Sequence, residues 1–286
     1  MSAKETPTTA CSPIRMNSIE IHFGPDVGRD PNDECDDIPL FERLSNAARF
    51  VQGTCDLTEA RRRWQLTKKW RAAYGTDDIL TEASPHYFIV KDNYPQYILG
   101  RSKEGRLVWF ERPGKGRLNT LLKNGVTLHD MARHYILTTE YLWRVAEPRD
   151  DAQIISVFDL TGCRLADLAG NTLKLFKMSC GLIADHYPER SQKVIMINAP
   201  WFFQAAFAIV SPFIDPVTKN KIEVLSTDYQ PRLLELVDAD QLPPLLGGTG
   251  PEPDQFPHQI HLRNLVSRTL EALGVDPSVI CPSRRK

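Results

Sequence analysis

A hydroxyl group and a cation lie close together at the start of a short helical pattern in the second half of the chain. Asp215 and Pro216 form a helix start, because aspartate caps helix N-termini and the first turn tolerates proline. Thr218 and Lys221 follow three residues apart and would share one face of that turn. Such a pair near the positive end of a helix suits a phosphate group, although a solvated helix start is the commoner meaning of these residues.

The other reactive residues form no catalytic set that we recognise. The sequence has no G-x-S-x-G nucleophile motif and no G-x-x-x-x-G-K-[ST] phosphate loop. Asp159 closes an apolar run and could act at a strand end, but a turn or cap role is favoured because no partner is positioned for it. For His258 and His261 a surface or core role is favoured over a metal site. We therefore expect a protein that is not an enzyme and that holds neither a metal nor a cofactor.

Strands and helices that alternate along the chain must position these residues. Two sequence patterns make the prediction: apolar runs of strand length cover residues 106–110, 154–160, 194–198 and 222–225, and helical periodicity covers residues 128–145, 173–183 and 258–273. This alternation predicts an α/β layer with buried strands. Two helices are expected upstream, the first beginning near Asp37 and Pro39 and the second running from an Asp56 cap to Gly75.

The charge of the chain is balanced, but one long stretch carries no charge. The 286 residues include 35 Lys+Arg and 36 Asp+Glu, which argues against a general binder of nucleic acid. The six cysteines show no zinc spacing, and we expect reduced thiols in a cytoplasmic protein. The 21 residues from Val194 to Ile214 are uncharged and could span a bilayer by length. Because Pro200 interrupts this stretch, we interpret it instead as a buried strand, a turn and an apolar helix over residues 201–210.

That apolar helix is unusual, because its aromatic and aliphatic residues lie on more than one side. An outer helix of an ordinary domain has one polar face. The helix at residues 201–210 must therefore be covered by protein, membrane or ligand on both sides.

Several motifs, in order, resemble those of the CRAL-TRIO lipid-transfer proteins of the yeast phosphatidylinositol/phosphatidylcholine type. The motifs are Y-P-E-R at 187–190, I-N-A-P at 197–200, D-P-V-T-K-N-K at 215–221 and the closing D-A-D-Q-L-P-P-L-L-G-G at 238–248. Supporting matches include residues 70–80, 94–111 and 154–162. The resemblance covers about residues 40–250, and this combination of motifs is highly specific.

The resemblance implies an α/β fold in which a helical N-terminal subdomain packs on a lipid-binding lobe. The lobe would have a mainly parallel sheet, flanking helices and an apolar pocket closed by a gate helix, with residues 201–210 and 213–222 forming the gate region. We assign the chain as follows: a disordered acidic tail at 1–37, the helical subdomain at 38–93, the lobe at 94–250, and a linker, C-terminal helix and basic tail at 251–286.

The resemblance also implies which residues contact a bound phospholipid. Glu189, Thr218 and Lys221 stand at positions that contribute in the family to the phosphatidylinositol headgroup site. Side chains of the sheet and the gate region would line the pocket: Ile98, Trp109, Ile154, Ser156, Phe158, Trp201, Phe203, Phe207 and Phe213. Ser156 keeps one hydroxyl position of the family's phosphatidylcholine pocket, whereas Ile154 replaces the other hydroxyl, and Ile98 and Trp109 replace two tyrosines.

The chain departs from the family pattern between Arg49 and Asp56, where a basic Arg-Lys pair is absent. Two charge-assisted contacts to the headgroup, each worth about 1.5–3 kcal/mol, would then be missing. Phosphatidylinositol binding would be weaker, or Arg61 or Arg62 on the following basic helix would supply the charge.

We expect the chain to bind one phospholipid and to exchange it between membranes, with phosphatidylinositol favoured and phosphatidylcholine as a second candidate. The protein would be a cytoplasmic monomer that visits Golgi-type or endosome-type membranes transiently and binds no nucleic acid. Two alternatives stay open. One is a binder of another hydrophobic ligand of the sterol, squalene or tocopherol type, and the other is a lipid-sensing scaffold that regulates a partner enzyme.

Overall fold

The computed structural model describes residues 45–54, 56–149, 151–214 and 216–275. The predicted acidic tail, the helix start at Asp37 and Pro39, the predicted cap Asp215 and the basic residues 283–286 lie outside the described residues.

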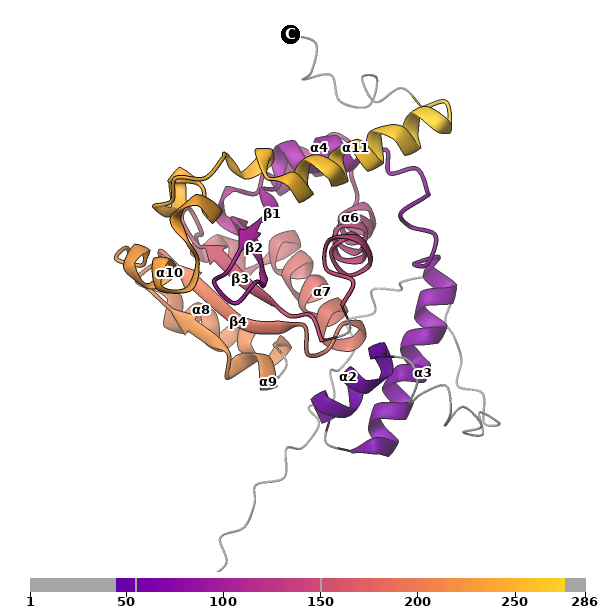
Figure 1. Cartoon of the computed structure of the whole chain (residues 1–286), viewed down its shortest axis with the longest axis horizontal. Coiled ribbons are helices and arrows are strands. Elements are labelled where there is room, and N and C mark those ends of the chain that lie inside the picture. Colours follow the sequence, from indigo (N-terminus) through magenta and orange to yellow (C-terminus); the bar gives the residue numbers. More distant parts are fainter. Residues whose placement is uncertain (1–44, 55, 150, 215, 276–286) are drawn as a thin grey trace, which may run out of the picture.

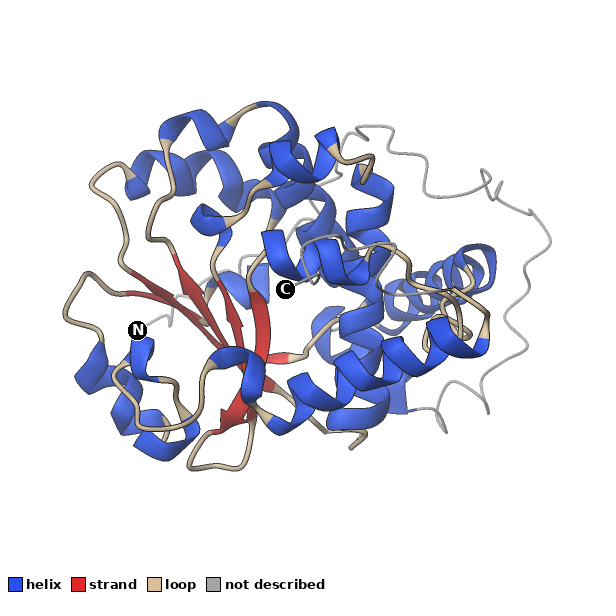
Figure 2. Ribbon diagram, turned by 90° about the horizontal axis from the view of Figure 1, so that it is seen from above, coloured by secondary structure: helices blue, strands red, loops and turns tan. Residues whose placement is uncertain are grey.

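Five strands form one sheet in the order β1-β2-β3-β4-β5. They are β1 (Gln96–Arg101), β2 (Leu107–Glu111), β3 (Ile154–Asp159), β4 (Ser191–Ile197) and β5 (Ile222–Val224). The pairing of β1 with β2 is antiparallel, whereas β2 with β3, β3 with β4, and β4 with β5 are parallel. The predicted strands and the mainly parallel α/β sheet are thus confirmed, and Figure 2 shows helices on either side of the sheet.

Alternate residues of the strands face two separate cores, as the two-residue period of a strand requires. Ile98, Trp109 and Ile154 belong to a core with helices α4 (Tyr87–Asn93), α6 (Leu128–Tyr141) and α7 (Gly170–His186); we call this side of the sheet the helical face. Their neighbours Leu99 and Val108 face the opposite core, which includes Leu233 of α10 (Gln230–Leu236). Most strand residues are therefore apolar, because both faces are covered.

Two N-terminal helices, α2 (Ser45–Thr54) and α3 (Leu57–Tyr74), pack against each other and against the lobe. The Asp56 side chain accepts hydrogen bonds from the backbone N–H groups of Thr58 and Glu59, and Gly75 ends α3 with a φ of 66°, so both predicted boundaries are confirmed. Glu59, three residues after Asp56, has the spacing of a capping box but does not complete one, since its carboxylate accepts from Arg62 instead.

The C-terminal helix α11 (Pro257–Ala272) is part of the main body. Leu262, Val266 and Leu270 are buried in the same core as Ile98, and the Gln259 Oε1 atom accepts from the Ile98 N–H at 3.3 Å. This helix contacts β1 and crosses the upper part of Figure 1. The stretch before it, predicted as a linker, holds the short helix Pro253–Gln255, which contacts β1.

The uncharged stretch forms the second half of β4, a turn at 198–202 and α8 (Phe203–Val210), as the proline interruption predicted. The connection then continues through a short helix Ser211–Phe213 and α9 (Pro216–Lys219) to β5. The helix expected at 213–222 is therefore much shorter than predicted, because Ile222 already pairs with Val194 of β4. Within the described ranges, no helix has the length and apolar character needed to cross a bilayer.

Candidate functional site

Parallel pairing of β4 with β5 brings Glu189 and Lys221 together from positions 32 residues apart. Glu189 precedes β4, Lys221 precedes β5, and the Lys221 carbonyl accepts from the Val194 N–H at 3.0 Å. The Lys221 Nζ atom lies 3.0 Å from Glu189 Oε2, and the side chains are 21% and 14% exposed respectively. The ion pair is therefore partly shielded from water but can still be reached from solvent.

Thr218 lies on the same turn as Lys221, as the three-residue spacing predicted. Its carbonyl accepts from the Lys221 N–H at 3.0 Å, which closes the turn between α9 and β5. Lys221 thus contacts both other residues of the predicted headgroup site, Glu189 through its side chain and Thr218 through its backbone. Contact of these residues with a headgroup stays a prediction.

The backbone at Glu189 has a conformation that non-glycine residues rarely adopt. Its φ is 56°, and among the described non-glycine residues only Asn198, at the other end of β4, also has a positive φ. Arg49 Nη1 and Gln153 Nε2 donate to the Glu189 carbonyl at 2.8 and 3.2 Å. Such a conformation costs about 1–3 kcal/mol and persists only where surrounding contacts hold it, often at functional sites.

The end of α2 lies next to this pair, in the stretch where the resemblance predicts a basic pair that this chain lacks. A Cβ atom added at Gly53 would lie 3.7 Å from Cγ and 3.8 Å from Oε1 of Glu189, which is ordinary contact distance. A longer side chain at position 53 would therefore reach the Glu189–Lys221 pair. Arg62, one predicted substitute, has its Nε and Nη2 atoms bound to Glu59 at 2.7 Å.

Five of the predicted pocket residues share the helical face of the sheet. Ile98 pairs with Trp109, Trp109 pairs with Ser156, Ser156 pairs with Val194, and Val194 pairs with Ile222, which forms a continuous row across all five strands. Ile154 and Phe158 lie two residues to either side of Ser156 and so face the same way. The structure brings these residues together, and their contact with lipid stays a prediction.

The helical face is closed at β1 and open at β5. Ile98 and Trp109 are 0% and 4% exposed, whereas Met196 is half-buried and Val224 is 44% exposed. The connection that contains α8 begins and ends at this open side, and no side chain of α8 is buried. An apolar surface is thus available where the predicted gate helix lies.

The predicted residues of the gate region differ in their surroundings. Phe203 and Phe207 are half-buried and stack on each other with ring centroids 5.5 Å apart. Trp201 is 89% exposed and packs edge-on against Phe202, so it points to solvent in this structure. The side chain of Phe213 lies outside what the structure describes.

A buried carboxylate on the helical face was missed by the sequence analysis. Glu111 is 5% exposed and accepts from Tyr94 Oη at 2.7 Å, Trp109 Nε1 at 3.2 Å and Gln96 Nε2 at 3.3 Å. Burial raises the pKa of Glu111 despite these donors. The hydrogen bond from Trp109 to Glu111 fixes the indole ring on the helical face of the sheet. In the sequence, a charged residue directly after the apolar run 106–110 could have indicated this buried carboxylate.

Asp159 has the turn role that the sequence favoured. It accepts from the Thr161 N–H at 3.0 Å, Asn198 Nδ2 at 2.8 Å and Arg112 Nε at 2.9 Å. Burial alone would raise the pKa of Asp159, but these hydrogen bonds outweigh it and hold the pKa below its ordinary value. The carboxylate therefore ties together the loops that follow β2, β3 and β4, including the turn that leads into α8.

Comparisons with known proteins agree with this geometry. Residues 91–248 match the CRAL/TRIO domain family. A SEC14 cytosolic factor from Eremothecium gossypii is 34% identical over 215 residues, which is 71% of this chain and 68% of that protein. The phosphatidylinositol/phosphatidylcholine transfer protein SFH7 from Arabidopsis thaliana is 31% identical over 221 residues, which is 74% of this chain.

The length of the match differs between relatives. The aligned part covers only 39% of the Arabidopsis protein, so the chain spans about two fifths of that relative. Among solved structures, the crystal structure of Sfh5 superposes with a TM-score of 0.57 at 15% identity, over 79% of this chain and 81% of that one. At this identity the superposition demonstrates a shared fold.

Proposed function

The chain belongs to the CRAL/TRIO domain family, and we propose that it binds a single phospholipid, with phosphatidylinositol as its first ligand, and exchanges it between membranes. The observation that carries the proposal is the Glu189–Lys221 ion pair one residue before Ile222, at the open end of the apolar helical face. A charged headgroup and its acyl chains would thus be held by adjacent parts of one site.

Such a protein increases the rate of lipid exchange and leaves its equilibrium nearly unchanged. A two-chain lipid has roughly 30 methylene groups, and each costs about 0.8 kcal/mol in water, so free passage between membranes is very slow. Movement from a bilayer into an equally apolar pocket costs little net free energy. Selectivity then depends on the few headgroup contacts, because acyl chains are nearly alike.

Three side chains supply those contacts in this proposal. Lys221 offsets the phosphate charge, the Thr218 hydroxyl donates to a phosphate oxygen, and Glu189 accepts from inositol hydroxyls while it orients Lys221. Phosphatidylcholine is the second candidate, with Ser156 as the remaining hydroxyl on the sheet.

The α8 helix serves as the gate in this proposal. Its side chains are half-buried or exposed, so displacement of α8 breaks few core contacts. The exposed Trp201 and Ile209 would enter the membrane when the pocket opens. A monomer suffices for this cycle.

The names of the relatives support the same role. They describe cytosolic factors and phosphatidylinositol/phosphatidylcholine transfer, not catalysis, which supports a non-enzymatic protein whose ligand is phospholipid. We propose a cytoplasmic protein that visits organelle membranes of the Golgi or endosome type transiently.

The test combines the lipids that co-purify with the protein and a vesicle-to-vesicle transfer assay. Mass spectrometry of extracted lipid should find phosphatidylinositol, and Lys221→Ala or Thr218→Asp should abolish its transfer with the fold unchanged by circular dichroism. The matched control is Lys219→Ala, which removes a half-buried cation two residues away, on α9.

Other results would reject the proposal. A co-purified sterol or other apolar ligand, retained equally by Lys221→Ala, would indicate the hydrophobic-ligand alternative. Bound phospholipid without any transfer would indicate a lipid-sensing scaffold. Full phosphatidylinositol transfer by both variants would remove Lys221 and Thr218 from the headgroup site.

A further inference from the structure

The connection that contains α8 is attached to the sheet at two ends, and each end involves a backbone position with positive φ. The chain leaves β4 at Asn198, whose φ is 55°. It returns to β5 after Lys221, the partner of Glu189, whose φ is 56°. Because non-glycine residues rarely keep this conformation without support, contacts at the two ends must hold it.

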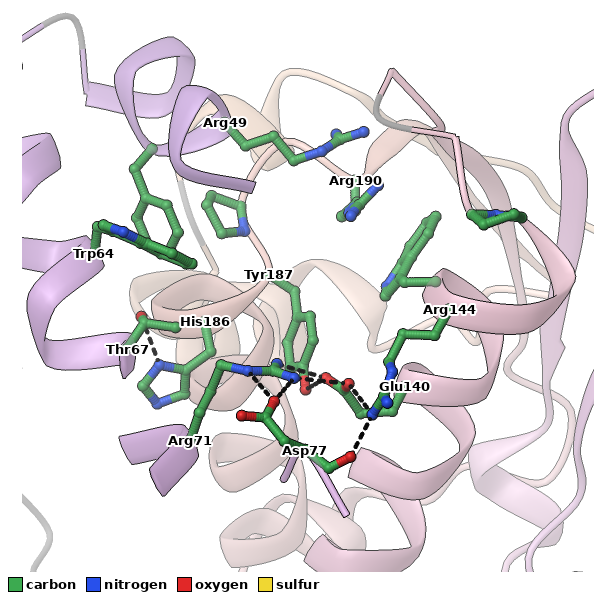
Figure 3. A pocket seen from close by; sticks show the side chains of 14 residues that line it. Arg49, Trp64, Thr67, Arg71, Asp77, Glu140, Arg144, His186, Tyr187 and Arg190 are labelled. Carbon is green, nitrogen blue, oxygen red and sulfur yellow. Dashed lines mark hydrogen bonds and ion pairs between the residues drawn. The ribbon is translucent and has the colours of Figure 1, made fainter. Parts of the chain in front are cut away.

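The return end is supported by the N-terminal helices. Arg49 of α2 donates to the Glu189 carbonyl at 2.8 Å. Arg49 and Arg190 also line a cavity of about 310 Å³ that lies between α2 and α3 on one side and α6 and the π-helical turn Leu142–Ala146 on the other. Figure 3 shows the Arg49 side chain extending from α2 toward Arg190. Support for this end thus comes from outside the sheet.

The departure end depends on a buried carboxylate. Asn198 Nδ2 donates to Asp159 Oδ1 at 2.8 Å, whereas the Asn198 backbone N–H donates to the Ser226 carbonyl at 3.3 Å. Burial raises the pKa of Tyr229, and a hydrogen bond with the Asn198 side chain offsets part of this rise, so Tyr229 is a second, neutral partner. Because a hydrogen bond to an ionised acceptor is about twice as strong as one between neutral groups, Asp159 is the principal anchor of Asn198.

Asp159 is itself held firmly at the end of β3. Its side chain is 3% exposed, and it accepts from Arg112 Nε at 2.9 Å and from the Thr161 N–H at 3.0 Å. Burial alone would raise the pKa of Asp159, but its hydrogen bonds hold the pKa below the ordinary value, so the group is ionised near pH 7. Asp159 is thus a charged acceptor whose position does not depend on Asn198.

Few contacts fix α8 between its two ends. No side chain of α8 is buried, and the helix contacts the short helices Leu165–Leu168 and Ser211–Phe213. The Phe203 N–H donates to the Pro200 carbonyl, inside the connection itself. Because α8 is short and weakly held along its length, a change of φ where the chain leaves the sheet would change the direction of the helix.

We propose that Asp159 is a positioning residue for the α8 gate, because its hydrogen bond holds Asn198 in the left-handed conformation from which the connection starts. Breaking this bond would let Asn198 return to an ordinary negative φ, and α8 would leave its present position. Backbone strain at Asn198 thus favours opening, and the bond to Asp159 opposes it. This role rests on the proposed function of α8 as a gate, and it identifies the residue pair at which the gate turns.

Hydrogen exchange of the full chain measures how often α8 opens. Asn198→Gly allows the positive φ without strain but removes the side chain, and Asp159→Ala removes the acceptor. In both variants we expect the amides of α8 to exchange about tenfold or more faster, which corresponds to the loss of a hydrogen bond to a charged acceptor. The amides of β4 should keep their wild-type protection, which distinguishes a moving gate from a weakened fold.

Two further variants separate the hydrogen bond from the backbone conformation. Asn198→Asp retains a residue type that tolerates a positive φ but places a carboxylate against Asp159, so α8 should exchange at least as fast as in Asn198→Gly. In the double variant that combines Asp159→Ala with Asn198→Gly, exchange should be no faster than in Asn198→Gly alone, because Asp159 acts through Asn198.

Two control variants remove comparable groups that do not anchor the gate. Tyr229→Phe removes the neutral partner of Asn198, and Asp130→Ala removes the carboxylate of the capping box at the start of α6. Both should leave the exchange of α8 close to the wild-type rate.

Transfer of pyrene-labelled phosphatidylinositol to phosphatidylcholine vesicles adds a functional measurement. The lipid should leave Asn198→Gly and Asp159→Ala faster than it leaves the wild type. Faster exchange of α8 with unchanged lipid release would overturn the role of this pair in gating. If the wild type holds no phospholipid, the proposed function fails, but hydrogen exchange still decides whether Asp159 positions α8.

The proposal is overturned if α8 exchanges at the wild-type rate in Asp159→Ala, or in both Asn198→Gly and Asn198→Asp. The two Asn198 variants decide the question if Asp159→Ala does not fold. The proposal is also overturned if Asp159→Ala accelerates exchange further in the Asn198→Gly background, or if Tyr229→Phe or Asp130→Ala accelerates α8 as much as Asn198→Gly does.

Discussion

At the scale of single residues, the geometry around Glu189 fixes the position of Lys221, the lysine of the proposed headgroup site. The Glu189 backbone is held by Arg49 and Gln153, and its side chain holds Lys221 within 3.0 Å. Position 53 lies beside this pair but carries glycine. The site therefore has a cation whose position is fixed, and position 53 beside it accepts a Cβ atom at ordinary contact distance.

We expect Gly53→Arg to strengthen phosphatidylinositol binding. A Cβ at this position lies at ordinary contact distance from Glu189 and Pro188, so an arginine can begin there and place a cation near Lys221. One further charge-assisted contact is worth about 1.5–3 kcal/mol, or at least about tenfold in affinity, which lipid-exchange assays would measure. Gly53→Gln is the control, because it shares the gain in helix propensity without the charge. Equal affinity of the two variants would contradict the prediction.

At the scale of elements, α8 and α11 present apolar residues in opposite ways. No side chain of α8 is buried, whereas α11 contributes Leu262 and Leu270, both 0% exposed, to the core. An apolar helix that remains uncovered suits a moving gate, and an amphipathic helix with a buried stripe suits a fixed support.

The exposed aromatic at the start of α8 should determine vesicle binding. Trp201 is 89% exposed, so Trp201→Ala removes few internal contacts and should leave the unfolding midpoint nearly unchanged. Because an indole ring buries about 150–250 Å² when it enters an interface, we expect at least about a tenfold loss in vesicle affinity by sedimentation. Leu273→Ala, 55% exposed after α11, should retain wild-type affinity. Undiminished sedimentation of Trp201→Ala would exclude this residue as an anchor.

The C-terminal helix should stabilise the lobe directly. Leu270 is 0% exposed and packs in the core that contains Ile98, so Leu270→Ala leaves a cavity and should lower the free energy of unfolding by about 2–5 kcal/mol. Leu273→Ala, at an exposed position, should change it by less than about 0.5 kcal/mol. Denaturant titration measures both values, and similar small losses would show that α11 is an appendage.

At the scale of the whole molecule, two buried histidines link stability to pH. Burial lowers the pKa values of both His134 and His186 to about 3, so both are neutral in the folded protein at pH 7. In the unfolded chain they take up protons near pH 6.5. Between these values the unfolded state binds more protons, so stability falls as the pH drops from about 6.5 toward 3, by up to about 1.4 kcal/mol per pH unit for each group.

His134→Phe should reduce this acid sensitivity. Both ring nitrogens of His134 are buried without a hydrogen-bond partner among the described residues, so phenylalanine removes an unsatisfied polar group as well as a titrating one. We expect a higher free energy of unfolding at pH 5 and a shallower pH slope than in the wild type. The exposed His129→Gln should keep the wild-type slope in the same denaturant series. If the free energy of unfolding had the same pH slope in all three proteins, His134 would take up its proton in the folded state as readily as in the unfolded state, which would contradict the prediction.

The sequence by itself determined many of the elements and some of their ends. Apolar runs identified the strands β2 to β5, Asp56 and Gly75 marked the ends of α3, and Pro200 divided the uncharged stretch into a strand and a helix. These features depend on backbone propensity and on periodicity, which act over a few neighbouring residues. The order of motifs likewise indicated the family before any geometry was known.

Only the tertiary structure decided which distant residues meet. Strand register aligned Ile98 with Trp109 and Ser156 in one row and brought Lys221 to Glu189. The burial of Glu111 and the cavity that joins Arg49 to Arg190 also followed from packing. A sequence pattern records which face a residue occupies, but contacts across strands and between helices depend on how those faces are assembled in space.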